Sequence, residues 1–241
     1  MAVSVDTVYQ RVLGILNKEQ RGYVTPQEFN LFANQAQLDI FEQYFYDINQ
    51  FGRLPGNSTE YSDMLTLLNE KINLFETTSV MTYSGGYFIL PTDLYRLGTI
   101  IYTNTTTNPF GVVSNEDIEV ERINKNEFLY INSSPLTKPK NVRPIYTADT
   151  NGIKAYGNTT LVSGVKCNYI KRPAKVEWGY QMVYGEALYD QSRSQDFELH
   201  ASEETDLVIK VLALAGLVTK EQDIYTVASQ EDALNTQQEK S

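Results

Sequence analysis

The period of the hydrophobic pattern changes twice along these 241 residues, and this change limits the fold more than any motif does. Apolar residues recur every three or four positions towards both ends of the chain, as in amphipathic helices, but alternate in the middle, as in half-buried strands. We therefore expect an α+β protein with an N-terminal helical bundle, a central antiparallel β-region and a C-terminal helix that packs back on the bundle. The expected parts are a helical region at 1–79, the β-region at 80–173, an extended interaction segment at 174–201, the C-terminal helix at 202–230 and a polar tail at 231–241.

The second predicted helix has the clearest start signal. Thr25 stands at the N-cap, Pro26 at the first helical position and Glu28 at N3, which is a capping box with proline in its favoured place. The helix is predicted to run to about Gln50. Its apolar face is wide enough to indicate more than one neighbour, some of them in another chain, and comprises Phe29, Phe32, Ala33, Ala36, Ile40, Phe41, Tyr44 and Phe45. Two further helices are expected, over Val5–Leu16 before Gly22 and over Ser58–Glu76 after Pro55-Gly56.

The central region begins with a hairpin signal. Ser84-Gly85-Gly86-Tyr87 separates the predicted strands Val80–Tyr83 and Tyr87–Leu90. Another strand is expected over Thr99–Tyr102, followed by a polar loop at Thr103–Pro109. The remaining expectations are a short helix or turn at Ile123–Ile131, an exposed connection at Ser133–Pro144, and a meander of Ile145–Tyr146, Gly152–Tyr156 and Thr160–Ile170 with a tight turn at Asn151-Gly152.

The C-terminal helix is predicted from a polar start and an apolar stripe. Ser202 is the expected N-cap, and the carboxylates of Glu203 and Glu204 suit the first turn. The stripe comprises Leu207, Val211, Leu214 and Val218. The segment before this helix, 174–201, contains Trp178 and several tyrosines but no period. A stretch of this length without regular structure is usually functional or bound to a partner.

Charge and composition exclude several classes of protein. The net charge of −10 argues against a protein that grips nucleic acid through phosphates, yet suits a surface past which DNA slides without adhering. The 17 tyrosines indicate either an extensive protein–protein interface or tyrosine-rich strands in the core. The single cysteine, Cys167, excludes an internal disulfide and a multi-cysteine metal site, and we expect it to be a small strand residue. No signal peptide or membrane span is expected, which fits synthesis in a reducing cytoplasm.

No residue pattern in the chain indicates catalysis. The only histidine, His200, lies just before a predicted helix and is expected to pack or hydrogen-bond there. Asp117, Glu119 and Glu121 alternate and are expected to share one face of a strand; such acids could serve a glycosidase, but a solvated strand face is far commoner. We therefore expect no enzymatic activity, no cofactor and no metal. Two small basic clusters, Lys138, Lys140 and Arg143 and then Lys171, Arg172 and Lys175, could contact phosphate or an acidic surface of a neighbouring subunit; the second suits an acidic protein better.

Three runs of the sequence resemble a family of bacteriophage head–tail connector proteins, the adaptor or ring proteins of short-tailed phages, including crAss-like phages. The runs are TPQEFNLFANQAQLDIFEQYF, then YFILPTDLYRLGTIIY, and last VKCNYIKRPAKVEWGY with DFELHASEETDLVIKVLALAGL, which is the most specific. The resemblance implies a ring, usually of twelve copies, beneath the portal protein or further down the tail. It also implies that DNA passes through the ring during ejection, and that a helical bundle is combined with a β-region.

The resemblance and the composition together lead to one expected function. The chain is expected to be a structural virion protein at the head–tail junction, assembled in the host cytoplasm from copies of itself and bound to the portal and other tail proteins, without sequence-specific DNA binding. The candidate interface anchors are Phe41, Tyr44, Phe45, Trp178 and Tyr184. Two alternatives stay open: a tail-associated hydrolase that acts on cell walls through the acidic strand carrying Glu119, and a module that binds host glycans.

Overall fold

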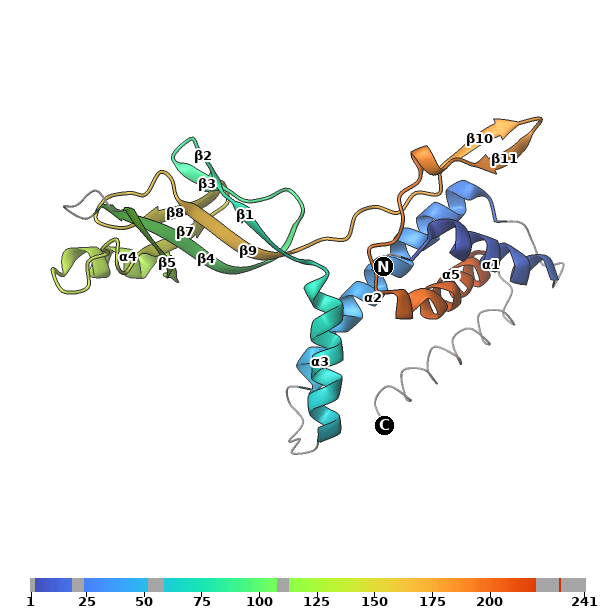
Figure 1. Ribbon diagram of the computed structural model, residues 1–241, viewed down its shortest axis with the longest axis horizontal. Coiled ribbons are helices and arrows are strands. Elements are labelled where there is room, and N and C mark those ends of the chain that lie inside the picture. Colours follow the sequence, from blue (N-terminus) through green and yellow to red (C-terminus); the bar gives the residue numbers. More distant parts are fainter. Residues whose placement is uncertain (1–2, 19–23, 52–58, 108–112, 220–229, 231–241) are drawn as a thin grey trace. The chain divides into compact units, whose positions relative to one another are not determined.

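The chain has an α+β fold, which confirms the predicted class, and its contacts divide it into two units. The computed structural model describes residues 3–18, 24–51, 59–107, 113–219 and 230. One unit, the helical unit, combines residues 1–74 with 173–241, and the other, the sheet unit, covers 75–172 (Figure 1). Each unit is described by itself below.

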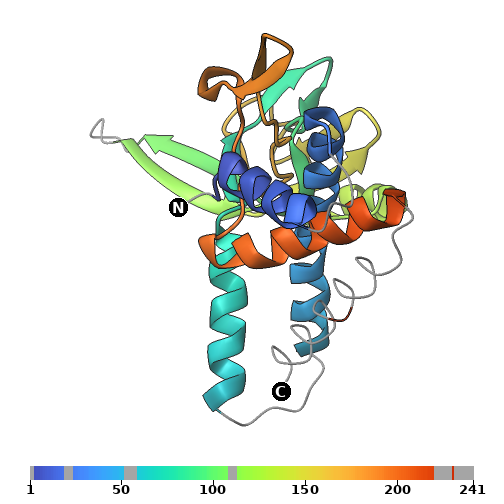
Figure 2. The same cartoon turned by 90° about the vertical axis from the view of Figure 1, so that its right-hand side faces the viewer.

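The described residues of the helical unit form four long helices. They are α1 (Val5–Lys18), α2 (Pro26–Phe51), α3 (Thr59–Asn73) and α5 (Glu204–Thr219). The C-terminal helix α5 packs against α1 and α2, as predicted, and α3 packs against α2 (Figures 1 and 2). The core between them is apolar and includes Val8 and Val12 of α1, Phe29 and Phe41 of α2, and Leu207 and Val211 of α5. None of the helices in the described ranges is both long and apolar enough to cross a bilayer.

The predicted capping box at the start of α2 is confirmed. The Thr25 N–H donates to Glu28 Oε2 at 2.9 Å, and the Glu28 N–H donates to Thr25 Oγ1 at 3.3 Å. Each side chain therefore satisfies a backbone donor that the helix itself leaves unpaired. The hydrogen bond from the Thr25 N–H favours the charged carboxylate, which lowers the pKa of Glu28.

Outside residues 108–112, which are not described, the sheet unit consists of two sheets and one short helix. The first sheet has the order β1-β9-β4-β5 and the second β2-β3-β8-β7-β6. The first comprises β1 (Glu76–Val80), β9 (Val165–Lys171), β4 (Leu94–Thr107) and β5 (Val113–Glu119). The second comprises β2 (Thr82–Ser84), β3 (Tyr87–Ile89), β8 (Gly152–Tyr156), β7 (Ile145–Asp149) and β6 (Glu121–Arg122), and α4 spans Lys125–Ser133. Pairing is antiparallel in both sheets except between β6 and β7.

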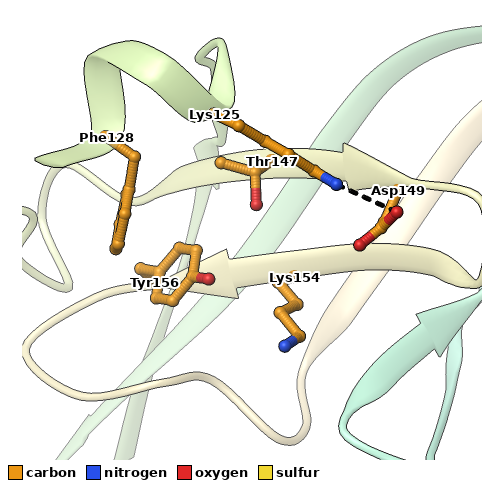
Figure 3. A pocket seen from close by; sticks show the side chains of 6 residues that line it. All are labelled: Lys125, Phe128, Thr147, Asp149, Lys154 and Tyr156. Carbon is orange, nitrogen blue, oxygen red and sulfur yellow. Dashed lines mark ion pairs between the residues drawn. The ribbon is translucent and has the colours of Figure 1, made fainter.

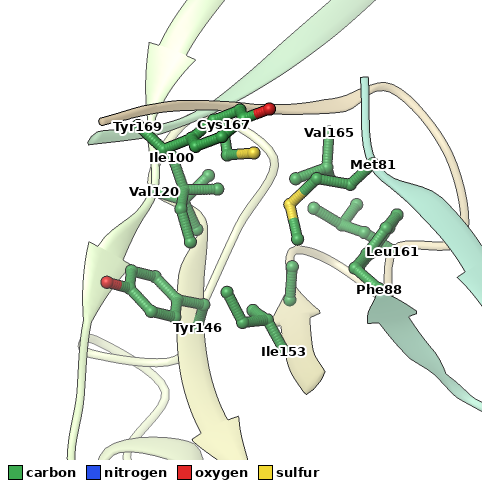
Figure 4. Packing of buried hydrophobic residues seen from close by; sticks show 11 residues of the cluster. Met81, Phe88, Ile100, Val120, Tyr146, Ile153, Leu161, Val165, Cys167 and Tyr169 are labelled. Carbon is green, nitrogen blue, oxygen red and sulfur yellow. The ribbon is translucent and has the colours of Figure 1, made fainter. Parts of the chain in front are cut away.

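The core of the sheet unit is a single cluster of apolar side chains drawn from both sheets. Figure 4 shows ten of them by name: Met81, Phe88, Ile100, Val120, Tyr146, Ile153, Leu161, Val165, Cys167 and Tyr169. Cys167 is a small buried strand residue, as predicted, and its burial raises the pKa of the thiol. The predicted hairpin is confirmed, because Ser84 pairs with Tyr87 and the two glycines between them both have positive φ.

Several predicted boundaries differ from the structure. The helical period ends earlier than expected: α3 stops at Asn73, and β1 begins at Glu76, within the predicted helical region. The predicted loop at Thr103–Pro109 is wrong up to Thr107, because its β-branched threonines extend β4 and pair with β5. The predicted meander is wrong in its last strand, because β9 pairs with β1 and β4 in the other sheet.

The C-terminal region also departs from its prediction in part. His200, not Ser202, is the residue that caps the helical start, and its Nδ1 accepts from the Ser202 N–H at 3.3 Å. A single 3-10 turn, Ala201–Glu203, then leads into α5. The prediction that His200 hydrogen-bonds at this start is confirmed. The predicted continuation of the helix over 220–229 and the predicted tail at 231–241 lie outside the described residues, as do Gly22 and Pro55-Gly56.

Candidate functional site

The segment at 174–178 lacks regular structure, as predicted, and is held in place by side chains of α2. The same prediction is wrong for residues 180–189, which form a hairpin. Asn34 Oδ1 accepts from the Val176 N–H at 2.9 Å, and Asn34 Nδ2 donates to the Val176 carbonyl at 2.8 Å. Asn30 makes the same two bonds to Trp178, at 2.8 and 3.4 Å. Gln37 donates to the Ala174 carbonyl at 2.8 Å. We call these three side chains the amide ladder.

The spacing of the amide ladder explains how a helix can hold an extended segment. Two residues of extended chain advance about 6.6 Å, and four residues of helix advance about 6 Å, so the two backbones stay in register over a short distance. A carboxamide carries both a donor and an acceptor and can satisfy the N–H and the C=O of one residue of the segment. The segment therefore needs no neighbouring strand to satisfy these backbone groups.

Trp178 fastens the end of this segment to the rest of the helical unit. Only 2% of its surface is exposed, and its Nε1 donates to Asp6 Oδ1 of α1 at 3.0 Å. Its ring lies 4.3 Å from the Tyr9 ring and stacks on Tyr180 at 5.9 Å, with Tyr189 at 5.8 Å. Tyr180 and Tyr189 are the first and last residues of a hairpin, so Trp178 joins the base of that hairpin to α1.

The hairpin consists of β10 (Tyr180–Val183) and β11 (Glu186–Tyr189), and we call it the hairpin arm. Asp190 stabilises its base: its carboxylate accepts from the Ser192 hydroxyl at 2.6 Å and from Gln181 Nε2 at 2.7 Å. These bonds, first of all that from Ser192, lower the pKa of Asp190. Figure 1 shows the arm projecting from the helical unit.

The hairpin arm exposes apolar side chains on both of its faces. Met182 and Leu188 are exposed, and Tyr184 at the tip is fully exposed, at 104%. A two-stranded hairpin is only marginally stable by itself. Its exposed apolar side chains bury no surface in the hairpin, so they do not stabilise it. Tyr184 also has a positive φ of 52°, beside Gly185 at 90°, a conformation that a bulky side chain rarely adopts. Such strain at an exposed tip is typical of a binding site.

The structure divides the five predicted interface anchors. Phe41, Tyr44 and Trp178 are core residues of the helical unit, and Phe45 is partly buried against Phe41 with ring centroids 5.1 Å apart. Phe41 and Tyr44 are covered where α2 packs against α3 and α5, and Trp178 packs against Tyr9 of α1, so these three side chains present no free surface for a neighbour. Tyr184 alone is exposed, and its interface role stays a prediction.

Sequence reasoning missed Met182 and Leu188 of the arm, as well as the amide ladder. Tyr184-Gly185 inside the run YQMVYGEALY is a hairpin signal, and its exposed apolar residues could have been found from it. The amides of the ladder lie at positions i, i+4 and i+7 of α2, beside the residues of the predicted apolar face. That spacing would have shown them to share a side of the helix.

The acidic residues weighed as a catalytic pair do not form one site. Asp117 and Glu119 lie exposed on β5, and Asp117 accepts from the Thr103 hydroxyl at 2.6 Å. Glu121 lies on β6, in the other sheet, and forms an ion pair with Arg143 at 3.0 Å. The prediction that all three share one strand face is therefore wrong. Within the described ranges, no three histidine, cysteine or acidic side chains are grouped so as to hold a metal ion.

A small open pocket of about 240 Å³ lies between α4, β7 and β8 in the sheet unit. Figure 3 shows Phe128, Tyr156 and Thr147 around the same space, and the two rings are 4.4 Å apart. Lys125 forms an ion pair with Asp149 at 2.9 Å, and this contact lowers the pKa of the aspartate. The one acid in the pocket is therefore a stable anion and not a proton donor.

Comparison with known proteins adds no assignment. No protein-family model matches the sequence, and no curated protein is significantly similar to it.

Proposed function

We propose that this chain is a structural, non-enzymatic protein of short-tailed bacteriophage particles. It forms a closed ring of identical copies at the head–tail junction, connects the portal to the tail and leaves a channel for DNA. The ring, its twelve copies and its position at the head–tail junction are what the sequence resemblance implies. The net charge of −10 supports a channel wall to which DNA does not adhere.

The observation that carries the proposal is the hairpin arm. Its base is held by the Trp178 ring and the Asp190 hydrogen bonds, while its apolar tip remains uncovered. A rigid base with an exposed apolar end is suited to insert into a neighbouring protein with little loss of entropy. In the proposed particle, that neighbour is the portal or the next ring of the tail.

The proposal is tested in purified particles. Antibody labelling of the wild-type protein should mark the head–tail junction in electron micrographs. A Met182→Ser, Leu188→Ser variant should fold normally, because both side chains are exposed, but should fail to enter particles. A matched control, Leu31→Ser on the exposed side of α2, should enter them as the wild type does. Normal entry of the arm variant, or label elsewhere on the particle, would count against the proposal.

A second candidate function, glycan binding, is favoured by the pocket in the sheet unit. Adjacent aromatic rings with a hydroxyl, an ammonium and a carboxylate nearby are groups that a sugar ring could stack on and hydrogen-bond with. Isothermal titration of the isolated protein with cell-wall and capsular oligosaccharides tests this candidate. Binding that Tyr156→Ala abolishes would support it, and no binding by the wild type would dismiss it.

A further inference from the structure

The sheet unit carries two exposed surfaces of opposite charge. The first, the acidic edge, is β5, which presents Glu116, Asp117 and Glu119. The sequence contains no lysine or arginine between Arg96 and Arg122, so nothing of opposite sign lies along β4 or β5 after Arg96. β5 is also an edge strand, because it pairs with β4 alone. Beyond Tyr102 this β4–β5 ribbon is only two strands wide, and it extends away from its sheet (Figure 2).

The second surface lies on α4 and the loop that follows it. Lys138 and Lys140 are exposed, and there is no acidic residue between Glu127 and Asp149. The same stretch of chain also exposes large apolar side chains: Tyr130 is 78% and Leu136 is 91% exposed, and Leu129 and Val142 are exposed too. We call this surface, residues 129–142, the basic segment. Apolar side chains bordered by charge are typical of a protein–protein interface.

The two surfaces do not neutralise each other within one chain. In the described part of the molecule, no ion pair joins Glu116, Asp117 or Glu119 to Lys138 or Lys140. The edge strand also leaves backbone N–H and C=O groups on its outer side without a strand partner. Both surfaces are therefore available to another molecule.

We propose that the acidic edge of one copy binds the basic segment of the next, and that this contact closes the ring. The inference rests on the proposed function and names the surfaces through which it operates. A second copy is the occupant that the charges favour, because each surface finds its complement on the same chain. In a ring, each copy offers its acidic edge to one neighbour and its basic segment to the other, so the contact is head-to-tail, and head-to-tail contacts generate rings when the rotation closes. A closed two-fold dimer that pairs both surfaces at once would overturn the inference.

Charge reversal tests the contact with two variants that are each other's complement. The first, Glu116→Lys with Glu119→Lys, has a basic edge and a basic segment. The second, Lys138→Glu with Lys140→Glu, has an acidic edge and an acidic segment. Either variant alone places like charges at every contact, and we expect its association to be roughly 10- to 100-fold weaker than that of the wild type. All four positions are exposed, so folding should be unaffected.

An equimolar mixture of the two variants restores opposite charges at every contact when the subunits alternate. Native mass spectrometry should then detect rings with equal numbers of the two variants and an even total. A control with the same charge change on exposed helical positions, Glu42→Lys with Glu70→Lys, should assemble as the wild type does. Added salt should weaken wild-type rings, because it screens exposed charges.

Each remaining outcome overturns the inference. Wild-type rings that both variants also form would place the contact elsewhere while leaving the proposed ring intact. If the wild type and the mixture both stay monomeric at the highest soluble concentration, the contact is not sufficient; labelling of particles then judges the proposed function independently. A further outcome is that the wild type binds duplex DNA or anionic vesicles. If only the Lys138→Glu, Lys140→Glu variant loses that binding, the basic segment binds phosphate groups and not a second copy.

Discussion

Replacing Asn34 by alanine tests whether α2 holds the extended segment. The carboxamide of Asn34 satisfies both the N–H and the carbonyl of Val176, at 2.9 and 2.8 Å, and Val176 is buried. Two neutral hydrogen bonds contribute about 1 kcal/mol each, and a buried group left unpaired loses about 1 to 3 kcal/mol. Since water can reach part of this site, we expect Asn34→Ala to lower the free energy of unfolding by about 2 to 4 kcal/mol.

The single tryptophan makes this measurement specific to the helical unit. Trp178 is two residues from Val176 and is buried, so its fluorescence in a urea titration reports the unfolding of this unit and not of the sheet unit. The matched control is Gln35→Ala, which removes an exposed amide one residue away on the same helix. Gln35 bonds only to Asp39 among the described residues, at 2.7 Å, and its loss should lower the free energy by less than about 0.5 kcal/mol.

Replacing Asn34 by aspartate, which has the same shape but is charged, separates the contribution of the amide donor from that of the acceptor. Asn34→Asp keeps an oxygen for the Val176 N–H but places a carboxylate against the Val176 carbonyl. We expect the pKa of this new carboxyl to be raised in the folded state, so its destabilisation should be largest above the usual carboxyl range and should shrink as the pH falls. Equal effects of Asn34→Ala and Gln35→Ala, within error, would refute the proposed role of the ladder.

Three further predictions concern the arm and the ion pairs. Tyr184→Asn should raise the free energy of unfolding by about 1 kcal/mol, because asparagine tolerates a positive φ, yet should reduce entry into particles; unchanged entry would deny the tip a binding role. Lys71→Met should lower the free energy of unfolding by about 3 kcal/mol because it leaves the carboxylate of Glu203 buried, whereas Arg11→Met, at an exposed pair, should lower it by less than about 1 kcal/mol; equal losses would contradict this. Folding lowers the pKa of Asp190, so the charged carboxylate stabilises the protein above the unfolded pKa, and this stabilisation is lost as the pH falls through the folded pKa. The difference in free energy of unfolding between wild type and Asp190→Asn should therefore shrink over that pH range. A difference that stays constant with pH would contradict this prediction.

The parts of the fold that the sequence predicts are those in which local chemistry and tertiary packing agree. The capping box at Thr25 and the hairpin at Gly85-Gly86 are determined by a few neighbouring residues, and both are found where expected. The end of β4, residues 103–107, reads as a loop in the sequence because threonine and asparagine are polar, although threonine is also a strong strand former. Its strand character depends on pairing with β5, which local composition does not reveal.

The candidate site could be predicted only in part, for a related reason. The aromatic residues Phe41, Tyr44 and Trp178 look alike in sequence whether they face a neighbouring chain or the chain's own core. Trp178 is covered because amide side chains about 140 residues away in the sequence hold its segment against α2, and Lys71 of α3 lies over the Tyr44 ring. Contacts of such long range leave no local pattern, whereas the turn at Tyr184-Gly185 does.

Cryo-electron microscopy of intact particles tests the central claim most directly. The account predicts a closed ring of this protein at the head–tail junction, with the Tyr184 tip of each copy inserted in an adjoining protein and the β5 edge of each copy against residues 129–142 of the next. Particles that lack the protein, or that hold single copies away from the junction, would contradict it.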